Sequence, residues 1–165
     1  MTSEHLLHTI PPIYDGNSKI LILGSFPSVK SREVSFYYGH PQNRFWRVLA
    51  AVLGCAVPSS NEEKTALLHS HNIALWDVIK SCDIVGSSDS SIKNVVPNDI
   101  GVILSSCGIR QIYSNGKTSE KLFNKYIKDT VGRDTVALPS TSPANASYNL
   151  ERLTDSWSVI KNNIR

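Results

Sequence analysis

The stretch Lys19-Ile20-Leu21-Ile22-Leu23-Gly24 decides the fold of this chain. Four aliphatic residues in a row, with no polar residue between them, predict a strand that is buried on both faces. Such strands belong to parallel sheets, because the connecting helices cover both faces of the sheet. We expect the strand to end at Gly24, where a loop begins.

Short apolar runs alternate with segments of helical periodicity along the rest of the chain. Further strands are expected at residues 73–76, 111–113 and 135–138. Helices are expected at residues 43–53, 61–68, 97–108, 118–127 and 150–160. Strands that are separated by helices pair in parallel, because a crossover connection is needed between them. The predicted fold is therefore α/β, a three-layer α/β/α arrangement around a central, mainly parallel four-stranded sheet, with loops over residues 25–42 and 81–94.

The composition indicates an ordinary globular chain. It has 165 residues, of which 41% are hydrophobic and 19% are charged, a size that suits one domain over residues 1–165. The uncharged, largely apolar stretch at residues 48–61 is shorter than the ~20 apolar residues that a membrane span requires. The N-terminus lacks the apolar segment of a secretory signal. We expect a cytoplasmic monomer that is not membrane-bound, associated with the nucleoid if the source is bacterial or archaeal.

The net charge and the spacing of cysteine and histidine residues indicate which macromolecules and metals the chain could bind. Lysine and arginine number 17 against 14 acidic residues, a net charge of +3 that permits a polyanionic partner without requiring one. Three cysteines without a C-x-x-C pair, and histidine pairs without a third ligand, predict no metal site. Gly116-Lys117-Thr118 is similar to the end of a phosphate-binding loop, but Gln111 occupies a position where that motif needs glycine. An ordinary strand-to-helix turn is therefore favoured there.

The expected ligand site lies at the carboxyl ends of the parallel strands, where open α/β sheets bind their ligands. Residues 24–27, Asp77, residues 115–117 and residues 139–143 meet at this edge. The loop after the first strand is longer than usual and, with the start of the next helix, carries Phe26, Phe36, Tyr37, Tyr38, Phe45 and Trp46. These rings either form a stacking surface for flat ligands or cover the end of the helix by packing.

Four segments in order resemble the uracil-DNA glycosylase superfamily. Gly24-Ser25-Phe26-Pro27-Ser28 and the block from Tyr38 to Trp46, Tyr-Gly-His-Pro-Gln-Asn-Arg-Phe-Trp, are similar to its sequence blocks. Residues 115–117 resemble a segment of thymine-DNA glycosylase, and residues 138–143 stand where the superfamily has its second DNA-contacting motif. The resemblance covers residues 19–160. It implies hydrolysis of the N-glycosidic bond to a damaged base in DNA, with no cofactor and no metal.

Position 26 distinguishes branches within this resemblance. Mismatch-specific uracil and thymine-DNA glycosylases have a catalytic asparagine where this chain has Phe26. Phe26, together with Tyr37 and Tyr38 before the His-Pro block, resembles the hypoxanthine-DNA (deoxyinosine) glycosylase branch. In that branch the asparagine that matches Asn43 is implicated in catalysis. The resemblance thus implies a monofunctional glycosylase of base excision repair that flips out a deaminated base, hypoxanthine before uracil, and leaves an abasic site.

The expected site residues follow from this match. Asn43 is the expected catalytic residue and would position the attacking water through its amide oxygen, or else it caps a helix that begins at Arg44. Five residues are expected to bind the base. The backbone N–H groups of Ser25 and Phe26 would act as donors, Tyr38 would stack on the base, and Asp77 would accept the N–H of a deaminated base or merely cap its turn. The full base-binding set is Gly24, Ser25, Phe26, Tyr38 and Asp77.

A second group of residues is expected to contact DNA. The loop at residues 140–144 would enter the minor groove with Pro143 as a wedge, or it is a plain serine- and proline-rich turn. The expected DNA-binding residues are Arg44, Asn115, Lys117, Ser140, Thr141, Ser142 and Pro143. Two other functions remain open: a nucleic-acid-binding module that has lost catalysis, and an N-glycosidase that acts on free nucleosides or nucleotides. Assaying base release from duplex DNA and its salt dependence separates these alternatives.

Overall fold

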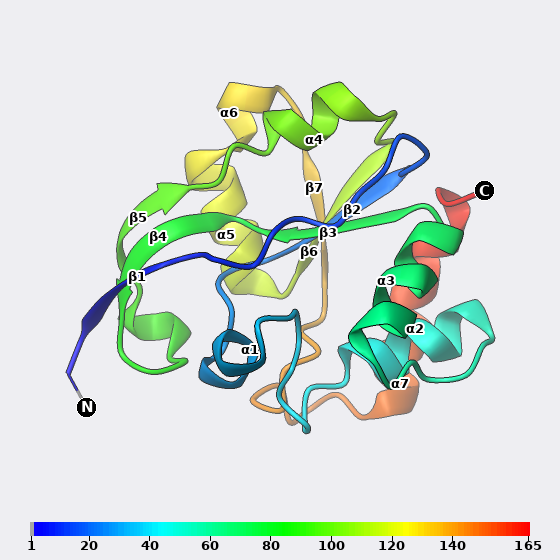
Figure 1. The fold of residues 1–165 in the computed structure, drawn as a ribbon, viewed down its shortest axis with the longest axis horizontal. Coiled ribbons are helices and arrows are strands. Elements are labelled where there is room, and N and C mark those ends of the chain that lie inside the picture. The colour runs from blue at the N-terminus through cyan, green and yellow to red at the C-terminus, as the bar shows by residue number, and fades with distance from the viewer. Residues whose placement is uncertain (1) are drawn as a thin grey trace.

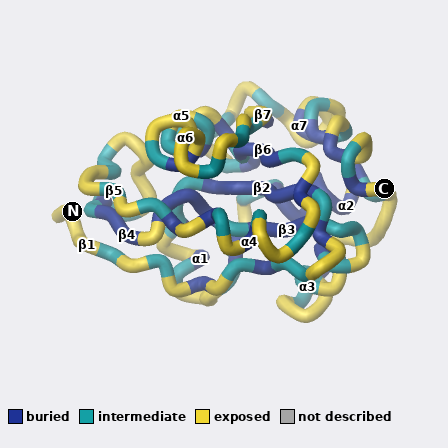
Figure 2. The backbone as a smooth tube through the Cα atoms, turned by 90° about the horizontal axis from the view of Figure 1, so that it is seen from above, coloured by how far each residue is buried: buried dark blue, intermediate teal, exposed yellow. Residues whose placement is uncertain are grey.

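A four-stranded parallel sheet forms the middle layer of the computed structural model, which describes residues 2–165 (Figure 1). Its strand order is β3-β2-β6-β7, and every neighbouring pair is parallel. The strands are β2 (Ile20–Gly24), β3 (Ile73–Asp77), β6 (Gln111–Asn115) and β7 (Thr135–Leu138). All five residues of β2 are buried, as the uninterrupted apolar run predicts, and β2 forms a continuous buried segment in Figure 2. The predicted α/β sheet is confirmed.

Two hydrophobic cores lie on opposite faces of this sheet. Alternate side chains of a strand point to opposite faces, so Ile20 and Ile22 join one core while Leu21 and Leu23 join the other. The first core is covered by α2 (Phe45–Leu53), α3 (Asn61–Ser70), α7 (Leu150–Trp157) and the 3₁₀ turn η2 (Ser158–Asn162). The second is covered by α4 (Gly101–Ser106), α5 (Lys117–Tyr126) and α6 (Lys128–Val131). Within residues 2–165, no helix is long and apolar enough to cross a membrane.

A second, antiparallel sheet was not predicted from the sequence. It consists of β1 (Glu4–Leu7), β4 (Ile79–Ile84) and β5 (Lys93–Pro97), in the order β1-β4-β5. The expectation of a loop over residues 81–94 is therefore wrong at both ends of that range. β1 and β5 are largely exposed, and their polar side chains conceal the strand pattern. The loop expected over residues 25–42 also contains a short helix, α1 (Val29–Val34), which is capped by Ser28.

One buried side chain holds the junction where the chain passes from β3 to β4. Val78 is the single residue between the two strands, and its N–H donates to the Gly24 carbonyl at 2.9 Å. The Nδ2 group of Asn98, a residue that is 7% exposed, donates to the carbonyls of Asp77 at 2.9 Å and Ile79 at 3.1 Å. These bonds satisfy buried carbonyls at the bend and fix Asp77 beside the end of β2.

We predict that Asn98→Ala lowers the free energy of unfolding by about 1–3 kcal/mol, because buried carbonyls at the bend lose their donor. Urea denaturation followed by circular dichroism measures this change. Asn17→Ala is the matched control, since Asn17 lies in an exposed turn and its loss should change stability by less than about 0.5 kcal/mol. Equal denaturation midpoints for the two variants would show that the bend does not depend on Asn98.

Candidate active site

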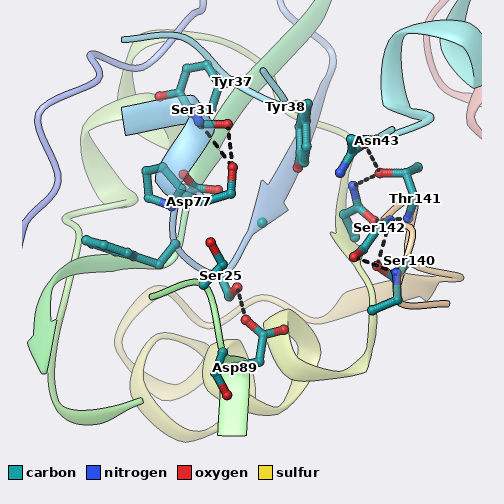
Figure 3. A pocket seen from close by; sticks show the side chains of 18 of the residues that line it. Ser25, Ser31, Tyr37, Tyr38, Asn43, Asp77, Asp89, Ser140, Thr141 and Ser142 are labelled. Carbon is teal, nitrogen blue, oxygen red and sulfur yellow. Dashed lines mark hydrogen bonds between the residues drawn. The ribbon is translucent and has the colours of Figure 1, made fainter. Parts of the chain in front are cut away.

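A pocket of about 410 Å³ opens at the carboxyl ends of β2, β3 and β6 (Figure 3). Its walls come from segments that are far apart in the sequence, including the loops after β2 and β7. All five residues expected to bind a base line it, together with the expected catalytic residue Asn43 and four of the expected DNA-binding residues. These lining residues are Gly24, Ser25, Phe26, Tyr38, Asn43, Asp77, Asn115, Ser140, Thr141 and Ser142.

A buried carboxylate lies on one side of the pocket. Asp77 Oδ2 accepts a hydrogen bond from His8 Nε2 at 2.8 Å, and the two side chains are 6% and 2% exposed. The other oxygen, Oδ1, lies so close to Gly24 that a Cβ there would overlap it. Among residues 2–165, His8 is the one hydrogen-bond partner of this carboxylate, so the alternative that Asp77 caps its turn is not seen. Its oxygen Oδ1 is left for a ligand.

Tyr38 forms an aromatic wall of the pocket. Its ring stacks on Phe45 with a centroid distance of 4.1 Å and an interplanar angle of 20°, which leaves the other face of the ring for a ligand. Its φ of 53° is unfavourable for a bulky residue, and contact with Phe45 helps to hold it. Burial and the charge of Asp77 both raise the pKa of Tyr38, so the phenol stays neutral. Phe45 itself is fully buried, so the packing interpretation holds for this ring, and a stacking role stays a prediction for Tyr38.

A chain of hydrogen bonds fixes the orientation of Asn43. Its Oδ1 accepts from the N–H of Phe45 and from the hydroxyl of Thr141, each at 2.9 Å. The Thr141 hydroxyl accepts in turn from Asn115 Nδ2 at 3.1 Å, and Asn115 Oδ1 accepts from the Thr141 N–H at 3.1 Å. A backbone N–H can only donate, so the oxygen of the Asn43 amide must face Phe45. Its Nδ2 has no acceptor within residues 2–165 and is the free polar group of this side chain.

This geometry corrects the role expected for Asn43. Both lone pairs of Oδ1 are occupied, so that oxygen is not available to position a water molecule. The helix α2 begins at Phe45 rather than at Arg44, and Asn43 supplies an acceptor to its first N–H. Asn43 therefore accepts a hydrogen bond at the start of α2, as the helix-capping alternative predicts. The group that it can offer to a ligand is Nδ2, which can only donate.

The turn after β2 presents two backbone donors. The carbonyls of Gly24 and Ser25 accept from Val78 and Ile79, at 2.9 and 3.1 Å, which fixes the turn against β3. Within the described chain, no acceptor receives the N–H of Ser25 or Phe26. The Phe26 ring packs edge-on against His8, with centroids 6.1 Å apart. The N–H groups of Ser25 and Phe26 are thus free to donate to a ligand, as expected for this turn.

Two of the expected DNA-binding residues have their side chains occupied inside the protein. The guanidinium of Arg44 donates to the carbonyls of Tyr148, of Ser142 at 2.8 Å and of Asn145 at 3.2 Å. Thr141 is fully buried and bonded to Asn43. Neither side chain is free to bind a phosphate, so the expectation that Arg44 and Thr141 contact DNA through their side chains is wrong. Arg44 instead organises the loop that follows β7.

The other expected DNA contacts lie on an accessible surface. Pro143 is exposed at the tip of the loop after β7, as a wedge requires. Lys117, Ser140 and Ser142 line a second hollow of about 620 Å³ beside the pocket, and Lys117 is exposed. Asn115 differs from these residues, because both atoms of its amide are bonded to Thr141 inside the protein.

The sequence interpretation missed two residues of the site. His8 was weighed only as a metal ligand, although it lies behind the pocket in the segment after β1 and bonds to Asp77, which lines it. Asp89 lies in the loop between β4 and β5 and lines the pocket from a third side. A hairpin between two strands, with the serine-rich tip 86–91 that contains Asp89, is the signal that would have drawn attention to this loop.

Comparisons with known proteins identify the family of this chain. The family model of the Uracil DNA glycosylase superfamily matches residues 11–162. A "Hypoxanthine DNA glycosylase" of Methanosarcina barkeri is 36% identical over 137 residues, 82% of this chain and 85% of that protein. A protein of the same name from Methanosarcina acetivorans is 34% identical over 152 residues, 91% of this chain and 94% of that protein.

A solved structure gives the same result for the fold. The chain is similar to a solution NMR structure from Methanosarcina acetivorans whose name places it with the uracil DNA glycosylases, with a TM-score of 0.79 and 33% identity. The similarity covers 92% of this chain and 94% of the other. The family match over nearly the whole chain and relatives above 30% identity together establish that this chain belongs to the uracil-DNA glycosylase superfamily.

Proposed function

We propose that this glycosylase is monofunctional and removes deaminated bases from DNA, hypoxanthine in preference to uracil, to leave an abasic site. The observation that carries the proposal is the fixed Asp77 carboxylate, held by His8 with one oxygen left for a ligand. The names of the two Methanosarcina relatives, both hypoxanthine DNA glycosylases, support the same choice of base. A DNA duplex is the proposed partner, and a monomer is proposed as the working form.

The base must leave the helical stack before the pocket can hold it. Unstacking costs a few kcal/mol and is easiest for a mispaired base, such as hypoxanthine opposite thymine or uracil opposite guanine. Pro143, exposed at the loop tip, would fill the space that the base vacates. The free face of the Tyr38 ring would then stack on the flipped base.

Asp77 would select the base by its hydrogen-bond pattern. A carboxylate accepts hydrogen bonds and cannot donate them. Hypoxanthine offers N1–H and uracil offers N3–H, whereas adenine and cytosine have bare ring nitrogens at these positions. A parent base would place its lone pair against the carboxylate and leave a buried acceptor unpaired, at a cost of about 1–3 kcal/mol. The pocket would therefore favour deaminated bases over their parents.

Fixed donors would assist the bond-breaking step. As the N-glycosidic bond breaks, negative charge develops on the departing base and positive charge on the sugar. The Nδ2 group of Asn43 and the N–H groups of Ser25 and Phe26 are held in place before the reaction, so they can stabilise the negative charge without reorganisation.

The direct test is a panel of oligonucleotides that contain hypoxanthine, uracil or xanthine, as single strands and as duplexes, with release scored as abasic sites. We expect release of hypoxanthine to be fastest and release of adenine to be undetectable. Free inosine is the control for a nucleoside hydrolase. Cleavage of free inosine at the rate of the duplex would contradict the proposal, as would the absence of release from every oligonucleotide.

We predict that Asn43→Asp slows single-turnover excision on the order of 10²–10³-fold, because a donor to the departing base is replaced by a carboxylate oxygen. The substituted side chain keeps an oxygen to accept from Phe45 and Thr141, so stability should be nearly unchanged, whereas Asn43→Ala should lose both rate and stability. Asn124→Asp, on the exposed face of α5, controls for the added charge. An Asn43→Asp protein with the wild-type rate would exclude the donor role.

We predict that Asp77→Asn loses on the order of 10–100-fold in single-turnover rate on hypoxanthine-containing duplex, which corresponds to about 1–3 kcal/mol. The amide oxygen of the variant can still accept from His8, so its NH₂ would face the base and meet the N–H of hypoxanthine. Binding to a duplex with an abasic site should not change, since no base is present to be recognised.

Asp83→Asn is the matched control for Asp77→Asn. Asp83 accepts from His5 Nδ1 at 2.7 Å on the exposed sheet, the same kind of pair outside the pocket. Equal losses of excision and of abasic-site binding in Asp77→Asn would mean that Asp77 shapes the loop rather than recognising the base. Unchanged excision would remove Asp77 from the site.

A further inference from the structure

A second carboxylate, Asp89, lines the pocket at a different place from Asp77. It lies on the short 3₁₀ turn η1 (Asp89–Ser91), and its Oδ1 accepts from Ser25 Oγ at 3.4 Å (Figure 3). Asp89 is exposed to solvent, whereas Asp77 is 4% exposed. Asp89 therefore marks the mouth of the pocket and Asp77 its interior. Within residues 2–165, no basic side chain forms an ion pair with Asp89.

The loop that carries Asp89 is held in place by several hydrogen bonds. Ser87 Oγ accepts from the N–H of Val29 at 2.9 Å, and Arg32 donates to the Gly86 carbonyl at 3.2 Å. Inside the loop, Ser91 Oγ accepts from the Val85 N–H at 2.8 Å. The bonds to Val29 and Arg32 attach the loop to α1, and the bond from Ser25 to Asp89 attaches it to the turn after β2. Asp89 therefore has a defined position at the mouth of the pocket.

Hydrolysis needs an acceptor for a proton of the attacking water, and the other candidates in the pocket are occupied or apolar. Phe26 has no polar side-chain atom. Both lone pairs of Asn43 Oδ1 are used, and Asp77 is assigned to the base. Asp77 and Asp89 are the two carboxylates among the described residues that line the pocket. Asp89 is thus the remaining strong acceptor, and it lies where the sugar must remain when the base is deep inside.

We propose that Asp89 is a catalytic residue that orients the attacking water and accepts its proton. This inference rests on the proposed function. The water oxygen forms a bond to C1′ of the sugar as the bond from C1′ to the base nitrogen breaks, and the electron pair of that bond leaves with the base. The water proton passes to Asp89 and then to solvent, and the base takes up a proton from solvent. The charge of Asp89 also stabilises the positive charge on the sugar.

The electrostatics of the mouth fit this role. Although Asp89 as a whole residue is exposed, the protein around its carboxyl removes part of the solvent there and raises its pKa above that of a free aspartate, and the hydroxyls of Thr118 and Ser25 partly oppose the rise. A raised pKa makes the carboxylate a better proton acceptor. Near the phosphates of bound DNA a negative charge weakens binding, so the loss of the Asp89 charge should not loosen the complex.

Several ionisable groups face this region and must be separated from Asp89 in a pH experiment. Asp77, Tyr37 and Tyr38 line the same pocket. Lys117 of α5 and Tyr148 share the adjacent hollow with Asp89, and Arg32 of α1 bonds to the same loop. The ratio of the wild-type rate to the Asp89→Asn rate isolates Asp89, since these groups are present in both proteins.

The test compares wild type, Asp89→Asn and the control Asp129→Asn, an exposed carboxylate on α6, in single-turnover excision of hypoxanthine from duplex DNA. We expect Asp89→Asn to be about 10²-fold slower, the lower range for loss of a general base. The ratio should shrink as the pH falls through the Asp89 pKa, because the wild-type carboxyl becomes protonated. Abasic-site duplex should bind Asp89→Asn at least as tightly as wild type.

The outcomes are distinguishable. An amide oxygen can accept the same hydrogen bonds as the carboxylate, so a loop-shaping role predicts a wild-type rate for Asp89→Asn, and that result would overturn the inference alone. A pH-independent rate ratio, or weaker binding of abasic-site DNA, would do the same. Asp89→Glu, which restores a carboxylate, should be faster than Asp89→Asn, and equal rates would contradict the role. Absence of excision by wild type would overturn the proposed function and this inference with it.

Discussion

The close approach of the Asp77 carboxylate to the Cα of Gly24 is the constraint on which the rest of the site depends. Parallel pairing places these two residues side by side at the ends of β2 and β3, and only a residue without a Cβ leaves room for the carboxylate. His8 then fixes one carboxylate oxygen, and Asn98 fixes the backbone on either side of Val78. The antiparallel sheet thus has a function in the site, because β1 leads directly to His8.

A second set of contacts joins the other half of the pocket. Asn115 at the end of β6, Thr141 in the loop after β7 and Asn43 before α2 form one continuous line of hydrogen bonds. Each member satisfies a buried polar group of the next, so the loss of one leaves its neighbour unpaired. The line fixes the Asn43 amide in one orientation. Preorganised donors of this kind need no rearrangement during the reaction, which is what electrostatic catalysis requires.

The residues at the ends of the parallel strands were predictable from the sequence, and the residues brought by the antiparallel sheet were not. Apolar runs mark β2 and β3, and their carboxyl ends must meet, so Gly24 and Asp77 follow from pattern and topology. β1 is a short exposed strand without such a pattern, and His8 becomes visible only once the strand is paired with β4. Asn43 illustrates a different limit. It lies in the pocket as expected, but the sequence pattern could not show that Thr141, a partner 98 residues away, takes the second lone pair of its Oδ1 and leaves only Nδ2 for a ligand.

The proposed place of a carboxylate beside the base creates a conflict that the two sides of the pocket would resolve. Asp77 would favour a base that carries an N–H, yet its negative charge would oppose the negative charge that grows on the departing base. Recognition and departure must therefore act on different edges of the base, with the carboxylate at the N–H and the donors at the acceptors of the ring. The structure separates these groups, since Asp77 is held by the β1 segment and Asn43 by the loop after β7. Under the proposed role of Asp77, a parent base such as adenine would be disfavoured at the N–H edge before the donors act, so selectivity would be set before the bond breaks.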